Sequence, residues 1–230
     1  VLSQPEMLRA LLQEHDVHTY VSGHHHAYYP GRRGSLQLLH AGALGSGPRP
    51  LLGRTEASPN TITVVDVDLD TETTRYTTME AATLDTIDIA TLPKALHGVN
   101  GFVVRRDLTL EGEYSGVLSP LHAVSNVSST ATGTATATVE DSVLQVSGTF
   151  EGLSSDLTEN GGARAALFAG INGRPGDRVA DVEVTSSDNR SGTFSAEVPL
   201  DVEGIDLLLA GSYYVNVFTA DYPNGEIRAQ

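Results

Sequence analysis

Several features are missing from this 230-residue sequence, and each absence excludes a class of protein. There is no cysteine, so neither disulfides nor thiolate metal ligands contribute, and the sequence does not indicate a redox compartment. Lysine is almost absent, because Lys94 stands alone against thirteen arginines and the net charge is −15. So few cations cannot assemble a basic face, and we therefore expect no surface for binding nucleic acid.

Long hydrophobic runs are also missing. No stretch approaches the roughly eighteen apolar residues that a membrane-spanning helix needs, so we expect no membrane span. With 40% hydrophobic and 19% charged residues the composition is globular, and 230 residues suffice for one large or two ordinary domains. The first residue is Val1 rather than methionine, and we expect the chain to be the later part of a longer protein.

Histidine, by contrast, is concentrated near the start. Five of the eight histidines lie at or before residue 26, and three are consecutive in Ser22-Gly23-His24-His25-His26. Imidazole is the commonest metal ligand. The apolar residues Val17–Val21 predict a strand, and Gly23 allows a sharp bend where that strand ends. On such a backbone His24 and His26 can reach two neighbouring ions or two faces of one ion. The alternatives are a solvated polar loop and an adventitious nickel or zinc binder.

The sequence Gly23-His24-His25-His26, after a short helix and a strand, resembles the Gly-His-x-His motif of calcineurin-like metallophosphoesterases. This resemblance implies a two-metal hydrolase of phosphate mono- or diesters, with His24 on one divalent ion, His26 on the other and His25 turned away. The identity of the metal stays open among zinc, iron, manganese and nickel. The family's remaining ligands lie in earlier motifs, among them Gly-Asn-His, which this chain lacks. We therefore expect an upstream polypeptide to complete the site, and the chain alone to be inactive.

The residues before the histidines predict a helix. Ser3 is the expected N-cap, Pro5 lies in the first turn, and Glu6 closes a capping box. His15 and His18 flank the expected helix-to-strand turn, and we interpret them as surface residues or neighbours of the ligands. The apolar stripe that we expect to be buried consists of Met7, Leu8, Leu11 and Leu12.

After the histidines, Pro30–Gly34 predicts a turn and Leu36–Leu39 a buried strand. Arg32 and Arg33 in this turn suit a phosphate, although we favour solvated turn residues. Further on, alternating β-branched residues predict a hairpin of Thr61–Leu69 with Thr73–Met79.

The composition changes near residue 108. We predict that residues 1–108 are α/β, the C-terminal portion of a metallophosphoesterase sandwich, and that residues 109–230 form an all-β sandwich domain. The second part contains about eight short strands separated by glycine and asparagine turns, which is typical of a sandwich or barrel.

The end of the chain resembles the closing signature of the chordin-type domain, CHRD. In that family Tyr-Val-Asn-Val-His-Thr precedes Pro-x-Gly-Glu-Ile-Arg, and here Tyr214–Thr219 and Pro223–Arg228 follow the pattern. Members commonly carry three imidazoles that could bind a metal. The corresponding residues here are Ala166, Phe168 and Phe218, so we predict packed core and no metal in this domain. The resemblance also implies a secreted or periplasmic protein.

Two alternatives to the hydrolase stay open. The first is a non-catalytic extracellular binding or scaffold protein that carries a vestigial histidine loop. The second is a metal-binding or storage module without phosphoester chemistry.

Overall fold

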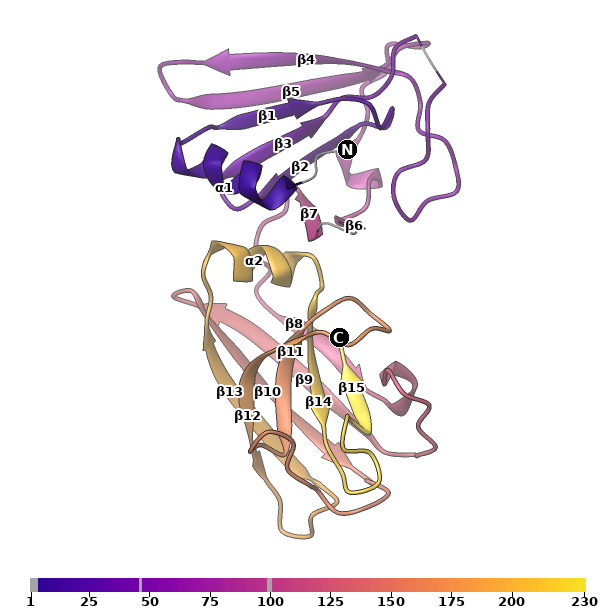
Figure 1. The fold of residues 1–230 in the computed structure, drawn as a ribbon, viewed down its shortest axis with the longest axis vertical. Coiled ribbons are helices and arrows are strands. Elements are labelled where there is room, and N and C mark those ends of the chain that lie inside the picture. The colour runs from indigo at the N-terminus through magenta and orange to yellow at the C-terminus, as the bar shows by residue number, and fades with distance from the viewer. Residues whose placement is uncertain (1–3, 46, 99–100) are drawn as a thin grey trace. The chain divides into compact units, whose positions relative to one another are not determined.

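The computed structural model describes residues 4–45, 47–98 and 101–230. The chain divides into two compact units, Val1–Leu108 and Thr109–Gln230. Figure 1 colours the first unit from indigo to magenta and the second from pink to yellow. Each unit has its own sheet and its own hydrophobic cluster, and each is described by itself.

The first unit is mainly β, with one α-helix, where the sequence predicted part of an α/β fold. Its principal sheet has the strand order β1-β3-β2-β7-β6, and within it only β1 and β3 run parallel. Strands β4 and β5 pair separately, which confirms the predicted hairpin. The elements are α1 (Pro5–Glu14), β1 (Thr19–Ser22), β2 (Tyr29–Arg33), β3 (Leu36–His40), β4 (Thr61–Asp68), β5 (Thr73–Glu80), the 3-10 helix η1 (Ile89–Thr91), β6 (Ala95–Gly98) and β7 (Gly101–Arg105).

Helix α1 starts at Pro5 as expected, but its apolar stripe is not core. Met7 is 68% and Leu11 is 48% exposed, and no residue of the helix is buried. The predicted cap Ser3 lies outside the described residues, and Glu6 pairs with Arg33 instead of closing a capping box. The helix is thus tied to the sheet by polar contacts, while Met7 and Leu11 are exposed and Leu8 and Leu12 are half-buried.

Strand β2 lies where the sequence predicted a turn. Its Gly31 explains the difference, because a Cβ at this position would lie 2.2 Å from Cγ1 of Val103. Because glycine has no side chain, β2 can approach β7 closely at this position. Glycine is also favoured in turns, so the residue type alone does not separate the two roles. The carbonyl of Pro30 accepts a hydrogen bond of 2.9 Å from the Arg106 amide.

The second unit is all β, as predicted, except for two short helical segments. Its eight strands form one antiparallel sheet of order β15-β14-β11-β12-β13-β10-β9-β8. The elements are β8 (Tyr114–Leu118), the 3-10 helix η2 (Pro120–His122), β9 (Thr132–Glu140), β10 (Val143–Glu151), β11 (Ala165–Ala169), β12 (Asp177–Thr185), β13 (Gly192–Pro199), α2 (Val202–Leu209), β14 (Tyr213–Val217) and β15 (Ile227–Ala229).

This sheet nearly closes on itself. Ser119, just after β8, exchanges two backbone hydrogen bonds with Arg228 of β15, at 3.0 and 3.2 Å. The first and last strands of the order are therefore joined. The sequence predicted an all-β sandwich or barrel, and the eight strands form one nearly closed sheet, a solution that leaves few free strand edges.

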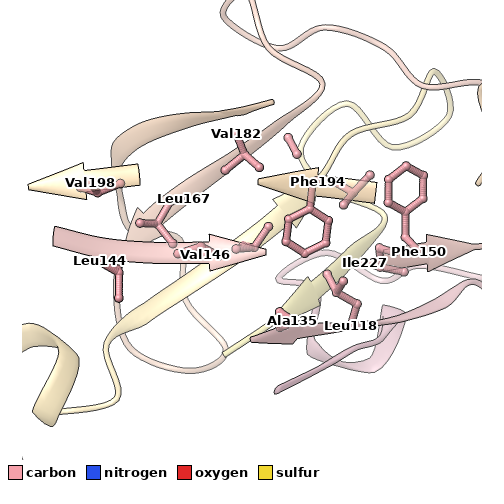
Figure 2. Packing of buried hydrophobic residues seen from close by; sticks show 14 of the residues in the cluster. Leu118, Ala135, Leu144, Val146, Phe150, Leu167, Val182, Phe194, Val198 and Ile227 are labelled. Carbon is pink, nitrogen blue, oxygen red and sulfur yellow. The ribbon is translucent and has the colours of Figure 1, made fainter. Parts of the chain in front are cut away.

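The closed sheet surrounds a single hydrophobic core. Figure 2 shows Leu118 of β8 and Ile227 of β15 beside Phe194 of β13, so strands from both ends of the order share the interior. Every second residue of each strand faces this core, as β periodicity requires. The core includes Leu118, Ala135, Leu144, Val146, Phe150, Leu167, Val182, Phe194, Val198 and Ile227.

Helix α2 follows strand β13. The carboxylate of Asp201 caps it by accepting a hydrogen bond of 2.7 Å from the Gly204 amide. Neither of the two α-helices in the described part of the chain is long and apolar enough to cross a membrane.

Gly148 is predicted to be essential for close strand packing. A Cβ there would lie 2.1 Å from the carbonyl oxygen of Thr134 and 2.3 Å from the Phe194 ring. Gly148→Ala should lower the free energy of unfolding by about 1–3 kcal/mol in urea titrations, because overpacking forces backbone shifts. Gly112→Ala is the control, since nothing lies within 4 Å of its added Cβ. Equal stability of the two variants would contradict this account.

Candidate functional site

The histidine loop, residues 22–26, begins where β1 ends. Ser22, the last residue of β1, lies opposite His40, the last residue of β3, in the parallel register. Ser22 Oγ and His40 Nδ1 share a hydrogen bond of 3.0 Å, and the Ser22 carbonyl accepts one of 2.8 Å from the Ala41 amide. The loop therefore starts at the carboxyl ends of two parallel strands, which is where such sheets place ligands.

Two of the three histidines have left-handed backbone conformations. His24 has φ of 75° and His26 has φ of 61°. This region is sparsely populated by residues other than glycine, although histidine enters it more often than most, and it costs on the order of 1 kcal/mol or more. The sequence predicted a sharp bend where the strand ends, and the backbone bends at His24 and His25.

The ring of His26 is oriented by a backbone carbonyl. Its Nδ1 lies 3.1 Å from the carbonyl oxygen of Gly47. A carbonyl can only accept, so Nδ1 carries the hydrogen, and Nε2 of the neutral ring holds the lone pair. A carbonyl that fixes the tautomer in this way is the usual partner of a metal-binding histidine. The ring of His24 is exposed.

His25 was expected to turn away from any metal. Its Nε2 is buried and has no hydrogen-bond partner. Burial lowers the pKa of His40 below its ordinary value of 6.5, and the charge of His25 lowers it further. His25 and His40 are thus electrostatic neighbours. The sequence analysis did not single out His40, because only the parallel register brings it to the loop.

The described residues do not by themselves form a metal centre. They contain no group of three or more histidine, cysteine or acidic side chains that could hold an ion. One Asp-x-His sequence does occur, at Asp16–His18, but His18 Nδ1 contacts the hydroxyl groups of Thr19 and Thr74 at 2.7 and 3.1 Å. The histidine loop thus offers donors that suit a divalent transition metal, but too few to retain one.

The two arginines after the loop are not solvated turn residues. Arg33 is buried, its Nη1 lies 2.9 Å from the Glu6 carboxylate, and its guanidinium lies 4.9 Å from the Phe102 ring centre. Arg32 donates a hydrogen bond of 3.4 Å to the Leu108 carbonyl. These contacts attach α1 and the end of the unit to the sheet.

In the second unit, the strands at one end of the order are buried on both faces. Val215 and Val217 of β14 face the core, whereas Tyr214 and Asn216 between them lie on the opposite face and are also buried. On β15 the core residues Ile227 and Ala229 similarly flank Arg228. Loops must therefore cover this second face.

Arg228 organises one of these covering loops. Its guanidinium donates to the carbonyls of Arg174 and Ile171, at 2.9 and 3.2 Å, and to Gln230 Oε1. It also stacks 3.4 Å from the centre of the Tyr214 ring, and burial lowers its pKa. The loop between β11 and β12 is thus held by a fully buried cation whose partners are carbonyls and an aromatic ring.

Glu226 is the buried acceptor of a second network. Its carboxylate accepts hydrogen bonds from the Ser154 amide and the Thr219 hydroxyl, both at 2.8 Å, and from the Ser129 hydroxyl. Glu226 is fully buried, so these charge-assisted bonds tie three distant segments together.

Residues 114–230 match the CHRD domain family, which is half of the chain and nearly the whole second unit. The chain belongs to the CHRD domain family. The match does not include the histidine loop. No curated protein and no solved structure matches the chain.

Contacts within the domain account for the residues of the closing CHRD signature. Asn216 Nδ2 donates 3.3 Å to the Asn224 carbonyl, and Gly225 has φ of 118° with its Cα packed against the Asn216 amide. Glu226 and Arg228 then supply the two buried networks. The sequence analysis recognised these residues as a signature but did not assign them structural roles.

Ala166, Phe168 and Phe218, which stand at the three positions where the resemblance places histidines, lie on one face of the CHRD domain's sheet. Ala166 and Phe168 of β11 pair with Asn216 and Tyr214 in register. The Phe168 ring stacks on Tyr214 at 5.2 Å and meets Phe218 edge-on at 6.3 Å. Ala166 and Phe218 are buried as predicted and Phe168 is half-buried, whereas the predicted absence of metal stays a prediction.

We predict that Glu226→Gln destabilises the CHRD domain. The amide would place hydrogens where a carboxylate now accepts bonds from Ser129, Ser154 and Thr219. The free energy of unfolding should fall by about 2–3 kcal/mol in urea titrations. Glu197→Gln, on the exposed side of β13, should change it by less than about 0.5 kcal/mol. A Glu226→Gln variant as stable as this control would contradict the network's role.

Protonation of His40 should destabilise the first unit. Its folded-state pKa is lowered, so its contribution to stability is complete above pH 6.5 and is lost as pH falls through the folded value. An NMR titration should place the His40 midpoint below 6.5, and His40→Gln should flatten the loss of stability with acid. A midpoint at or above 6.5 would refute the prediction.

Proposed function

We propose that the histidine loop supplies two ligands, His24 and His26, to a metal-dependent hydrolase of phosphate mono- or diesters. The observation that carries this proposal is the pair of left-handed conformations at these two residues, at the carboxyl end of a parallel strand pair. Backbone strain of this kind concentrates at functional sites. The resemblance of Gly23–His26 to the metallophosphoesterase motif supplies the reaction class.

The residues of the chain have distinct tasks in this proposal. The Gly47 carbonyl holds His26 as the tautomer whose Nε2 carries the lone pair. The hydrogen bond between Ser22 and His40 joins the two strand ends below the loop. When bound, two divalent ions would orient the phosphoester, activate a water molecule and stabilise the transition-state charge.

The loop has too few metal-binding side chains, so the proposal requires further ligands from another segment. Two imidazoles cannot hold two ions, and the described residues offer no third ligand beside them. The proposal therefore includes a further polypeptide segment, the upstream part of the same protein, which brings the remaining carboxylate, amide and imidazole ligands. We propose a secreted or periplasmic location, in keeping with the acidic, lysine-poor composition.

A second candidate follows from the CHRD domain. Its match covers residues 114–230, and aromatic side chains fill the face where related domains carry histidines. These observations favour a non-catalytic binding or scaffold role for this unit. If the histidine loop is vestigial, that role is the function of the whole protein.

The deciding experiment is metal analysis and turnover on the native protein, purified without chelator together with any associated polypeptide. We expect about two divalent ions per complex and hydrolysis of phosphate mono- or diesters. His24→Ala and His26→Ala should each reduce turnover by at least about 100-fold, since even partners of ligands cost 10–100-fold.

The matched control is His15→Ala, an exposed histidine outside the loop, which should leave turnover unchanged. Native material with neither stoichiometric metal nor hydrolysis would overturn the hydrolase and leave the binding role. Metal uptake without turnover would instead indicate a metal-binding module.

A further inference from the structure

Two stretches of the CHRD domain have the sequence Asn-x-Ser with no proline in the middle position. They are Asn126-Val127-Ser128 and Asn189-Arg190-Ser191. This pattern is the acceptor sequence for N-linked oligosaccharides, and a usable acceptor lies on a surface loop of an exported protein. The pattern itself does not rank the two stretches, so the surroundings of each asparagine decide between them.

The loop of Asn126 joins the 3-10 helix η2 to strand β9 and is only lightly held. Asn126 and Ser128 are exposed, and neither side chain makes a hydrogen bond within the described part of the chain. The backbone of residues 124–127 likewise makes none there. The backbone of Ser128 contacts the Tyr222 hydroxyl, at 3.2 and 3.3 Å. An enzyme can therefore bend this acceptor into its active site at the loss of few bonds, and the Ser128 hydroxyl is free for recognition.

The loop of Asn189 joins β12 to β13, and its acceptor groups are already occupied. The Ser191 hydroxyl donates a hydrogen bond of 2.7 Å to the Asp188 carboxylate. The same carboxylate accepts hydrogen bonds from the amides of Arg190 and Ser191, at 2.9 and 2.8 Å. The carbonyl of Asn189 accepts one of 2.9 Å from the Leu157 amide. Several of these bonds would have to break before an enzyme could bind this stretch.

The neighbours of the two asparagines differ as well. Leu121 and Val124, shortly before Asn126, are 91% and 46% exposed. An oligosaccharide is bulky and hydrophilic, so one attached at Asn126 would shield apolar surface that otherwise invites association. The residues on either side of Asn189 are Asp188 and Arg190, which are exposed and charged. An oligosaccharide at Asn189 would have no adjacent apolar residue to cover.

We propose that Asn126 carries an N-linked oligosaccharide and that Asn189 does not. The Nδ2 atom of Asn126 forms a bond to the anomeric carbon of a lipid-phosphate-linked oligosaccharide, and the bond from that carbon to the phosphate oxygen breaks. The lipid phosphate leaves with the electron pair, and Nδ2 gives up one proton to a base of the transferase. Nothing is oxidised or reduced. This inference rests on the proposed secreted or periplasmic location and is independent of the proposed hydrolase.

Peptide mass spectrometry on the protein isolated from its native host tests the site. Fragmentation that leaves sugars attached to the side chain assigns the modified residue. We expect sugars on Asn126 and an unmodified Asn189 in the same preparation. A bare Asn126 in exported protein, or equal occupancy of the two asparagines, would overturn the proposal.

Variants produced in the native host separate enzymatic transfer from chance reaction of an exposed amide. Asn126→Gln and Ser128→Ala should each abolish the modification, the second although the asparagine remains, whereas Ser128→Thr should retain it. Asn189→Gln is the matched control and should leave the sugars on Asn126 unchanged. The side chains of Asn126 and Ser128 make no hydrogen bond in the domain, so these variants should unfold in urea as the unaltered chain does. Undiminished occupancy in Ser128→Ala would refute an enzymatic transfer.

An assay on the folded chain tests the structural reason for the choice. The recombinant 230-residue chain and two peptides, residues 121–131 and 184–194, are incubated with membranes that contain the transferase and its lipid-linked donor. Both peptides should accept sugars, because neither retains the contacts of the folded domain. The folded chain should accept them at Asn126 alone. Transfer to the folded chain at both asparagines or at neither would contradict selection by the fold, and so would a peptide of residues 184–194 that stays bare.

The location and the modification site fail separately. If the native protein is exported and Asn126 is bare, the site falls and the location survives. If the native protein is retained in the cytoplasm, the location falls, and the assay on the folded chain still decides whether Asn126 is the acceptor that the fold selects.

Discussion

Burial of β14 and β15 on both faces is the constraint that shapes the CHRD domain. Most strands of the sheet need only alternate apolar and polar residues, since one face meets the core and the other meets water. At β14 and β15 the second face is also closed. Tyr214, Asn216 and Arg228 lie there beneath loops, and each needs partners that only those loops provide. An unpaired polar group in such a place would cost about 1–3 kcal/mol.

The residues of the family signature are therefore those that the burial of β14 and β15 on both faces requires. Glycine at 225 allows the turn against Asn216, while Glu226 and Arg228 draw separate loops onto the sheet. These residues need no catalytic role to explain why they occur together. Their partners, Ser129, Ser154, Ile171 and Arg174, lie far from them in the sequence, which explains why these contacts could not be inferred from it.

The first unit has the opposite character. Its hydrophobic cluster is small, its helix buries no residue, and its edge strand β1, like β6 at the other edge, has no second partner strand among the described residues. A strained histidine loop lies at the end of that edge. Both features belong to the part of the chain that the CHRD match does not cover.

How far the sequence predicted the structure depended on the range of the interactions. The β4–β5 hairpin and the all-β character of the CHRD domain, with about eight strands, were predicted correctly, because alternation and turn residues are local signals. Strand β2 was missed because Gly31 serves a close approach to β7 rather than a turn. The stripe of α1 was misread as core, since periodicity shows which residues share a face but not what covers it.

The same division holds for the candidate site. Three consecutive histidines after a glycine were enough to predict the loop, because residue type and spacing are local information, and the metal-binding role of the loop stays a proposal. The pairing of Ser22 with His40, the orientation of His26 by Gly47 and the burial of His25 Nε2 were decided only by tertiary structure. These features depend on strand register and on loop packing. Neither register nor packing is encoded in a short stretch of chain.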